Sequence, residues 1–90
     1  TVNKSLTVKV NLLKTIYHPN YAALINQLIE ARKRLPLTQL QLAMALSKPQ
    51  SYVAKVEGCE RKLDILEFVE WCHAPGQVPS EYIRRMEQHL

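Results

Sequence analysis

The chain has 90 residues, 47% of them apolar, which is typical of one globular domain with a modest hydrophobic core. It has no apolar run long enough for a transmembrane helix and no secretory signal, so we expect a cytoplasmic protein without a membrane partner. Residues 1–62 hold ten Lys or Arg against three Glu, and residues 63–90 hold two Arg against five acids. This asymmetry of charge favours a polyanionic partner for the basic part of the chain. The alternative is a chance distribution of charge on a solvated surface.

Residues 1–16 form a predicted N-terminal arm, and residues 17–90 a predicted domain. Within the arm, residues 5–12 alternate strictly between polar and apolar; the apolar ones are Leu6, Val8, Val10 and Leu12. This is the periodicity of a β-strand, and no second strand is visible elsewhere in the sequence. We expect the four apolar residues to mediate dimerisation by pairing with the same segment of a second copy. A disordered tail, or capture of a different protein by the arm, is the alternative.

The first predicted helix covers residues 21–35, after the breaker His18-Pro19-Asn20, where Asn20 can cap it. Its apolar residues recur at helical spacing: Tyr21, Leu24, Ile25, Leu28, Ile29 and Leu35. Three basic residues, 32–34, close the helix where its dipole favours positive charge.

Residues 37–58 predict two short helices around a tight turn. Thr38 and Gln41 have the spacing of a capping box at the start of the first of them. Its apolar residues are Leu37, Leu40, Leu42, Ala43 and Leu46. Ser47-Lys48-Pro49 interrupts the pattern, and Pro49 suits the first position of a new helix.

That new helix, residues 49–58, buries Val53 and Val56 and exposes polar side chains. The exposed set is Gln50, Ser51, Tyr52 and Lys55. Two helices joined by such a turn form a helix-turn-helix, whose second helix enters the major groove of DNA. An amide can pair with adenine, a lysine can contact guanine or phosphate, and hydroxyls can bind phosphate oxygens.

Two further helices complete the prediction. A polar loop containing Arg61 and Lys62 precedes a helix at 64–73, whose inward residues are expected to be Ile65, Leu66, Val69 and Cys72. The last helix starts near Pro79 and carries Tyr82, Ile83, Met86 and Leu90, which either complete the core or form a dimer surface. The predicted fold is therefore mainly α, with five helices and an N-terminal β-strand arm.

Over residues 17–90 the sequence resembles the Cro/repressor-type (XRE-type) helix-turn-helix family. The residues that carry the resemblance are Arg32, Leu37-Thr38-Gln39, Leu42-Ala43, Gln50-Ser51-Tyr52-Val53 and Val56-Glu57. The resemblance implies a repressor-like domain in which Gln39 holds a phosphate, Tyr52 contacts the DNA backbone, and Gln50, Ser51 and Lys55 face base edges. Lys48, Arg61 and Lys62 complete the predicted contacts, and Arg32 and Glu57 form a structural ion pair.

The chain departs from the family pattern at three turns. Pro36 stands where the family usually has glycine before Leu-Thr, and Ser47 stands at the usual glycine of the central turn. After the third helix, Gly58 comes one place early, and Cys59 occupies the usual glycine site. Glycine serves such corners by adopting positive φ, which Pro36 cannot do, so the turn before the second helix must differ in detail.

Other chemistries find no support in the sequence. The residues that could bind zinc, which are Cys59, Cys72, His18, His73 and His89, fit no known ligand spacing, and the cysteines are expected to be reduced thiols. There is no phosphate-binding glycine loop or nucleophile elbow, so we expect no enzyme, cofactor or metal. The predicted function is a sequence-specific transcriptional repressor that binds double-stranded DNA as a homodimer. The alternative is an antitoxin-type module whose arm binds a partner protein while the domain represses its own operon.

Overall fold

The computed structural model describes residues 15–88. The elements in order are η1 (Thr15–Tyr17), α2 (Pro19–Arg34), α3 (Gln39–Leu46), α4 (Gln50–Glu57), α5 (Ile65–His73) and α6 (Pro79–Glu87). The predicted fold of five α-helices is confirmed, and each helix begins within two residues of its predicted start. The predicted strand and its dimerisation residues, Leu6, Val8, Val10 and Leu12, lie outside the described residues. The predicted boundary between arm and domain falls inside η1, where Ile16 packs against the core.

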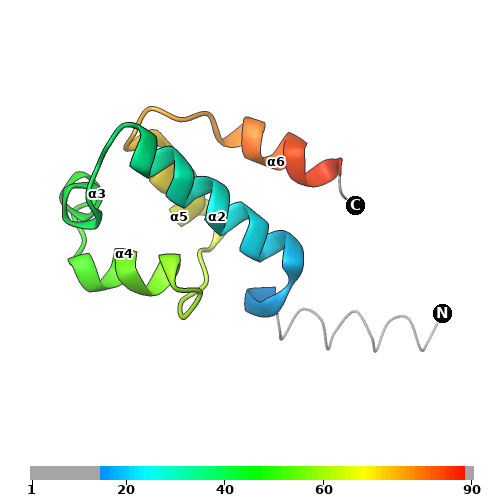
Figure 1. Cartoon of the computed structure of the whole chain (residues 1–90), viewed down its shortest axis with the longest axis horizontal. Coiled ribbons are helices and arrows are strands. Elements are labelled where there is room, and N and C mark those ends of the chain that lie inside the picture. Colours follow the sequence, from blue (N-terminus) through cyan, green and yellow to red (C-terminus); the bar gives the residue numbers. More distant parts are fainter. Residues whose placement is uncertain (1–14, 89–90) are drawn as a thin grey trace.

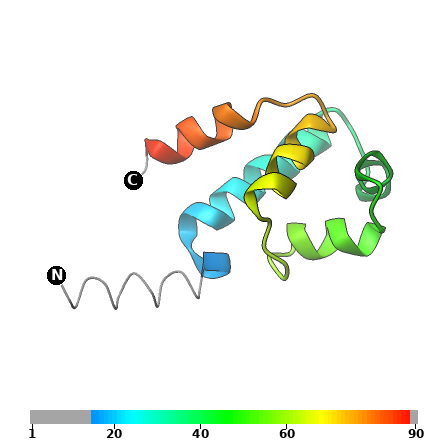
Figure 2. The same cartoon turned by 180° about the vertical axis from the view of Figure 1, so that it is seen from behind.

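The longest helix, α2, crosses the molecule, and the other helices are arranged around it (Figure 1). In both views α4 lies on one side of α2 and α6 lies on the other, and the view from behind brings α5 in front of α2 (Figure 2). The core draws on all five helices, and its least exposed large side chains are Trp71, Ile25, Leu42, Val53, Val56 and Cys72. Within residues 15–88, no helix has the length and apolar character needed to cross a bilayer.

The starts of the helices follow from local capping. Thr38 and Gln41 form the predicted capping box: the Gln41 N–H donates to Thr38 Oγ1 at 3.0 Å, and the Thr38 N–H donates to Gln41 Oε1 at 2.9 Å. The expectation that Asn20 caps the first long helix is wrong, because the Asn20 N–H donates to His18 Nδ1 at 3.0 Å. Pro19 has no N–H and a φ suited to the first helical position, which makes the residue before it the cap.

Two turns place non-glycine residues in the left-handed region of backbone space. Ser47 at the end of α3 and Cys59 after α4 both have φ of 56°. Both are positions where the family pattern has glycine, whereas Gly58 has an ordinary φ of −84°. Both turns therefore adopt the backbone conformation that favours glycine, at the steric cost of a Cβ atom.

Several apolar residues predicted to face the core are on the surface. Leu40 is 51% exposed, Ile65 is 67% exposed and Leu66 is 74% exposed. The reason is that each of these short helices has apolar residues on more than one face, so spacing alone does not identify the buried one. The core takes Leu42 and Ala43 from α3, and Phe68, Trp71 and Cys72 from α5.

Candidate nucleic-acid interface

The eight residues of α4 divide into a packed face and a solvent face. Val53 and Val56 are fully buried, Tyr52 beside them is half-buried, and the Glu57 side chain is almost completely shielded. With 3.6 residues per turn, the opposite face carries Gln50, Ser51, Ala54 and Lys55, and all four are exposed. The packed face holds α4 against α2 and α3. The side chains of the solvent face therefore project from a helix that is fixed in position.

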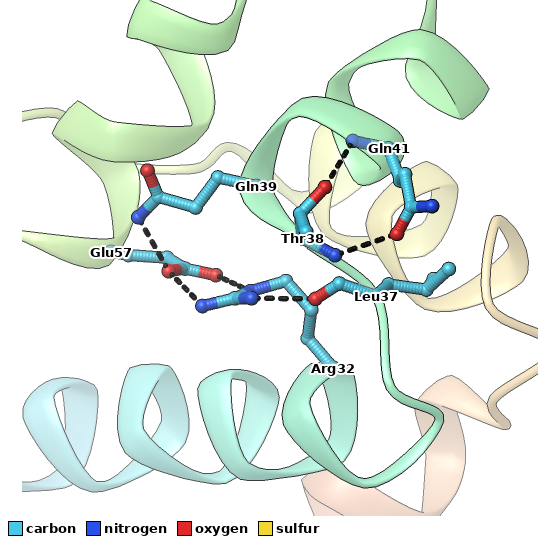
Figure 3. Close-up of polar contacts among 6 residues, drawn as sticks. All are labelled: Arg32, Leu37, Thr38, Gln39, Gln41 and Glu57. Carbon is cyan, nitrogen blue, oxygen red and sulfur yellow. Dashed lines mark hydrogen bonds and ion pairs between the residues drawn. The ribbon is translucent and has the colours of Figure 1, made fainter.

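A network of charged and polar side chains fixes both ends of the helix-turn-helix to α2 (Figure 3). Arg32 Nε donates to Glu57 Oε2 at 2.7 Å and Arg32 Nη2 donates to Glu57 Oε1 at 2.9 Å, while Nη1 donates to the Leu37 carbonyl at 2.6 Å. The two side chains are only 11% and 6% exposed. An Arg–carboxylate pair with two hydrogen bonds has a defined geometry. Because Arg32 also binds the Leu37 carbonyl, it fixes the end of α4 and the chain leading into α3 relative to α2.

Gln39, the residue expected to hold a phosphate, is part of the same network. Its Nε2 donates to Glu57 Oε1 at 2.9 Å, and the side chain is half-buried at the first position of α3 (Figure 3). An amide nitrogen has two hydrogens, and this contact uses one of them. The contact with Glu57 holds the Gln39 side chain in place, and the other hydrogen of Gln39 Nε2 can donate to an external acceptor.

Tyr52 differs from its predicted exposed position. Its ring is half-buried and packs against Trp71 of α5, with ring centroids 5.7 Å apart. The guanidinium of Arg61 lies 4.7 Å from the Tyr52 centroid and the ammonium of Lys48 lies 5.6 Å from it. Burial raises the pKa of the Tyr52 hydroxyl, as does the nearby charge of Glu67, so the hydroxyl remains a neutral hydrogen-bond donor.

Arg61 is held by Glu67 from the first turn of α5. Arg61 Nη1 and Nη2 donate to Glu67 Oε1 and Oε2 at 3.1 and 2.8 Å. Glu67 also belongs to a second capping box: its N–H donates to Asp64 Oδ1 at 2.8 Å, and its Oε1 accepts from the Asp64 N–H at 3.0 Å. The hydrogen bonds from Arg61 and from the Asp64 backbone hold the pKa of Glu67 below its usual range.

Comparisons with known proteins agree with this geometry. No protein-family model matches the chain, and no curated protein matches it. A solved structure, an XRE-family like protein from Pseudomonas syringae pv. tomato str. DC3000, is 40% identical and superposes with a TM-score of 0.78, covering 88% of this chain and 96% of that one. The chain belongs to the XRE family. The resemblance expected from residues 17–90 is therefore confirmed.

In this XRE-family chain, six of the eight predicted contact residues form two groups, and Gln39 and Lys62 lie outside both. Gln50, Ser51 and Lys55 share the solvent face of α4, and Lys48, Arg61 and Tyr52 meet at the tyrosine ring. Gln39 is tied to Glu57. Lys62 is exposed and lies at the edge of an apolar groove next to Leu63.

Sequence reasoning did not assign a role at this surface to Glu67 or Trp71, the two α5 residues that position Arg61 and Tyr52. The spacing Asp64-x-x-Glu67 is a capping-box signal, but the contact of Glu67 with Arg61 depends on the path of the loop between α4 and α5.

Among residues 15–88, no three or more side chains of the kinds that ligate metals gather at one place.

Proposed function

We propose that this XRE-family protein is a sequence-specific DNA-binding transcriptional regulator, a repressor, that places helix 49–58 in the major groove. The observation that carries the proposal is the division of α4. Its solvent face presents an amide, a hydroxyl and an ammonium group, and its packed face is anchored to α2 through the Glu57–Arg32 pair. A rigid support for base-contacting side chains is what a specific reader of DNA requires.

The chemistry of each group suggests its contact. The Gln50 amide can pair bidentately with adenine, and Lys55 can donate to guanine. Ser51 can serve either a base or a phosphate. Lys48, Arg61 and Lys62 supply positive charge for the phosphate backbone, and Tyr52 and Gln39 can each donate one further hydrogen bond. The proposal thus separates residues that read sequence from residues that set position.

The proposed regulator acts as a homodimer on a two-fold operator. The two recognition helices must then meet successive major-groove faces about 34 Å apart. The proposed dimer contact is an antiparallel ribbon of residues 5–12, because a two-fold axis makes each strand run opposite to its mate. Capture of a different protein by the same arm would instead favour the antitoxin-type alternative.

Selection of bound fragments from genomic DNA tests the proposal. The full chain should enrich fragments that share a short inverted repeat. Gln50→Ala and Lys55→Ala, both on the solvent face of α4, should lose that enrichment. Arg84→Ala is the control, since it also removes a positive charge but lies on α6, on the other side of α2 (Figure 1). Enrichment of no common sequence, or the same sequences from all four proteins, would contradict the proposal.

A further inference from the structure

An apolar groove lies where α2, α5 and α6 meet, on a border that α4 does not share. It is a hollow of about 180 Å³ lined by Tyr21, Leu24, Lys62, Leu63, Asp64, Ile65, Phe68 and Ile83. Ile65 is 67% exposed and Ile83 is 41% exposed, and the adjacent Leu66 is also on the surface. Exposed aliphatic side chains gathered around a hollow indicate a contact surface. α6, which supplies Ile83 to the groove, lies on the opposite side of α2 from α4 (Figures 1 and 2), and Lys62 is the groove residue that also belongs to the proposed DNA contacts.

The chain itself contains a segment that fits this groove. The sequence of residues 5–12 alternates so that a strand there would carry a single row of aliphatic side chains, Leu6, Val8, Val10 and Leu12. The first 14 residues also contain three lysines and no acidic residue, whereas residues 63–90, which supply α5 and α6, have a net charge of −3 from two Arg and five acids. Asp64 and Lys62 both lie in the groove wall and offset each other in charge. The apolar row is therefore complementary to the groove itself, and the opposite charges are those of the arm and of the surrounding α5 and α6.

The arm is also attached near the groove. Residue 15 begins η1, which packs against the start of α2, and Tyr21 and Leu24 from the first two turns of α2 line the groove. An extended chain spans roughly 3.3 Å per residue, so the nine residues before residue 15 reach about 30 Å. This is about twice the radius of gyration of 14.3 Å, and it brings residues 5–12 within reach of the groove of either copy.

Backbone hydrogen bonding favours a paired arm over a single strand. A single strand lying in its own groove would satisfy its apolar row but leave two rows of backbone N–H and C=O groups without partners. Residues 15–88 contain no strand to pair with it. A strand from a second copy supplies hydrogen-bond partners for one of those two backbone rows. In the resulting ribbon, the apolar side chains of both strands lie on one face.

We propose that residues 5–12 of a second copy dock on the groove formed by Leu24, Ile65, Phe68 and Ile83, as part of a two-stranded ribbon. This inference rests on the homodimer of the proposed function. The apolar row lies on the groove, and Lys9, on the alternate row, remains in solvent. The groove thus sets where the ribbon sits on each domain, and so contributes to the spacing of the two α4 helices.

Sedimentation of matched surface variants tests the docking. Ile65→Gln/Ile83→Gln should raise the dimer dissociation constant by about tenfold or more, because two aliphatic side chains lose their burial. Leu40→Gln/Met44→Gln is the control, since it makes the same kind of change on α3, where both residues are exposed. It should leave the constant unchanged. Circular dichroism verifies that both variants remain helical. An unchanged constant for Ile65→Gln/Ile83→Gln would overturn the docking.

A variant lacking residues 1–13 separates the two levels of the proposal. If truncation weakens the dimer and Ile65→Gln/Ile83→Gln does not, the ribbon stands and docking on the groove is wrong. If truncation has no effect, the homodimer through the arm is wrong, and the docking fails with it. DNA selection by the full chain is a separate measurement, so failure of DNA recognition is distinguishable from both results.

A nitroxide label shows which copy supplies the arm. It is attached to Val10→Cys in a Cys59→Ser background, and this chain is mixed with a second chain that carries labelled methyl groups but no nitroxide. Broadening of the Ile65, Leu66 and Ile83 methyl signals, without broadening of Leu40, is the expected result. Broadening that occurs only when both labels are in one chain would place the arm in its own groove and overturn the proposal.

Discussion

Arg32 and Glu57, 25 residues apart in the sequence, meet through two hydrogen bonds of 2.7 and 2.9 Å. Arg32 is in the last turn of α2 and Glu57 is the last residue of α4, so the pair joins the central helix to the end of the helix that presents Gln50 and Lys55. Both side chains are almost completely shielded from water. A shielded pair is of most consequence when one partner is lost, because the remaining charge then has no counter-charge.

Glu57→Ala should therefore lower the melting temperature far more than Glu87→Ala, which removes an exposed glutamate at the end of α6. Loss of one member of a buried pair costs about 3–5 kcal/mol. In a domain of this size, each kcal/mol shifts the melting temperature by roughly 4–8 °C. Thermal denaturation followed by circular dichroism measures both variants. Equal melting temperatures would show that the pair contributes no more than an exposed charge.

Ser47→Gly should stabilise the protein, because it removes a Cβ atom from a residue with φ of 56° and ψ of 43°. The net gain should be about 0.5–1 kcal/mol, since glycine also increases the entropy of the unfolded chain. Cys59→Gly relieves the same φ but loses some packing against the core, so its gain should be smaller. Urea denaturation measures the free energy of unfolding of each variant.

Ala45→Gly is the control for these two substitutions. Ala45 is exposed inside α3, where glycine should destabilise by about 1 kcal/mol. Opposite signs for Ser47→Gly and Ala45→Gly would tie the gain to the positive φ. A loss of stability in Ser47→Gly would mean that the turn at 47–49 is not strained.

The Arg61–Glu67 pair should make stability depend on acid pH. The pKa of Glu67 is lowered from its ordinary value of 4.5, first by the hydrogen bonds from Arg61 and next by the backbone of Asp64. A lowered pKa in the folded state means that the contribution is complete above 4.5 and is lost as pH falls through the folded pKa. Between about pH 5 and about pH 3, Glu67→Gln should therefore lose less stability than the original chain.

Urea denaturation across this pH range, read from Trp71 fluorescence, measures the difference. Glu87→Gln, an exposed substitution on α6, provides the comparison. Added salt should shrink the effect, because the Arg61 side chain is 43% exposed. Parallel pH profiles for Glu67→Gln and the original chain would show that the pair does not favour the charged form of Glu67.

Features that depend on neighbouring residues could be predicted from the sequence. The Thr38–Gln41 capping box needs only a spacing of three residues, and it is present. The central turn could be located because Ser47-Lys48-Pro49 interrupts an apolar pattern. The cap of α2 lies at His18, two residues before the predicted Asn20, because Pro19 prefers the first helical position.

Features that depend on distant segments could not be predicted in the same way. Tyr52 is half-buried because α5 brings Trp71 against it, and nothing within α4 indicates that contact. Arg61 is held by Glu67 because the loop after α4 turns back toward α5. The pairing of Arg32 with Glu57 is implied only by family resemblance, since the two charges are 25 positions apart in the sequence and have other possible partners.

The affinity of α4 variants for DNA tests the central claim most directly. Fluorescence anisotropy is measured on a selected operator and on a random duplex, each over a range of salt concentrations. Gln50→Ala and Lys55→Ala should each weaken operator binding by about 1–3 kcal/mol and leave random binding nearly unchanged, because they remove base contacts. Lys62→Ala should weaken both duplexes alike and flatten the salt dependence by about one unit, as expected for a phosphate contact. Unchanged operator affinity for both Gln50→Ala and Lys55→Ala would contradict the assignment of α4 as the recognition helix.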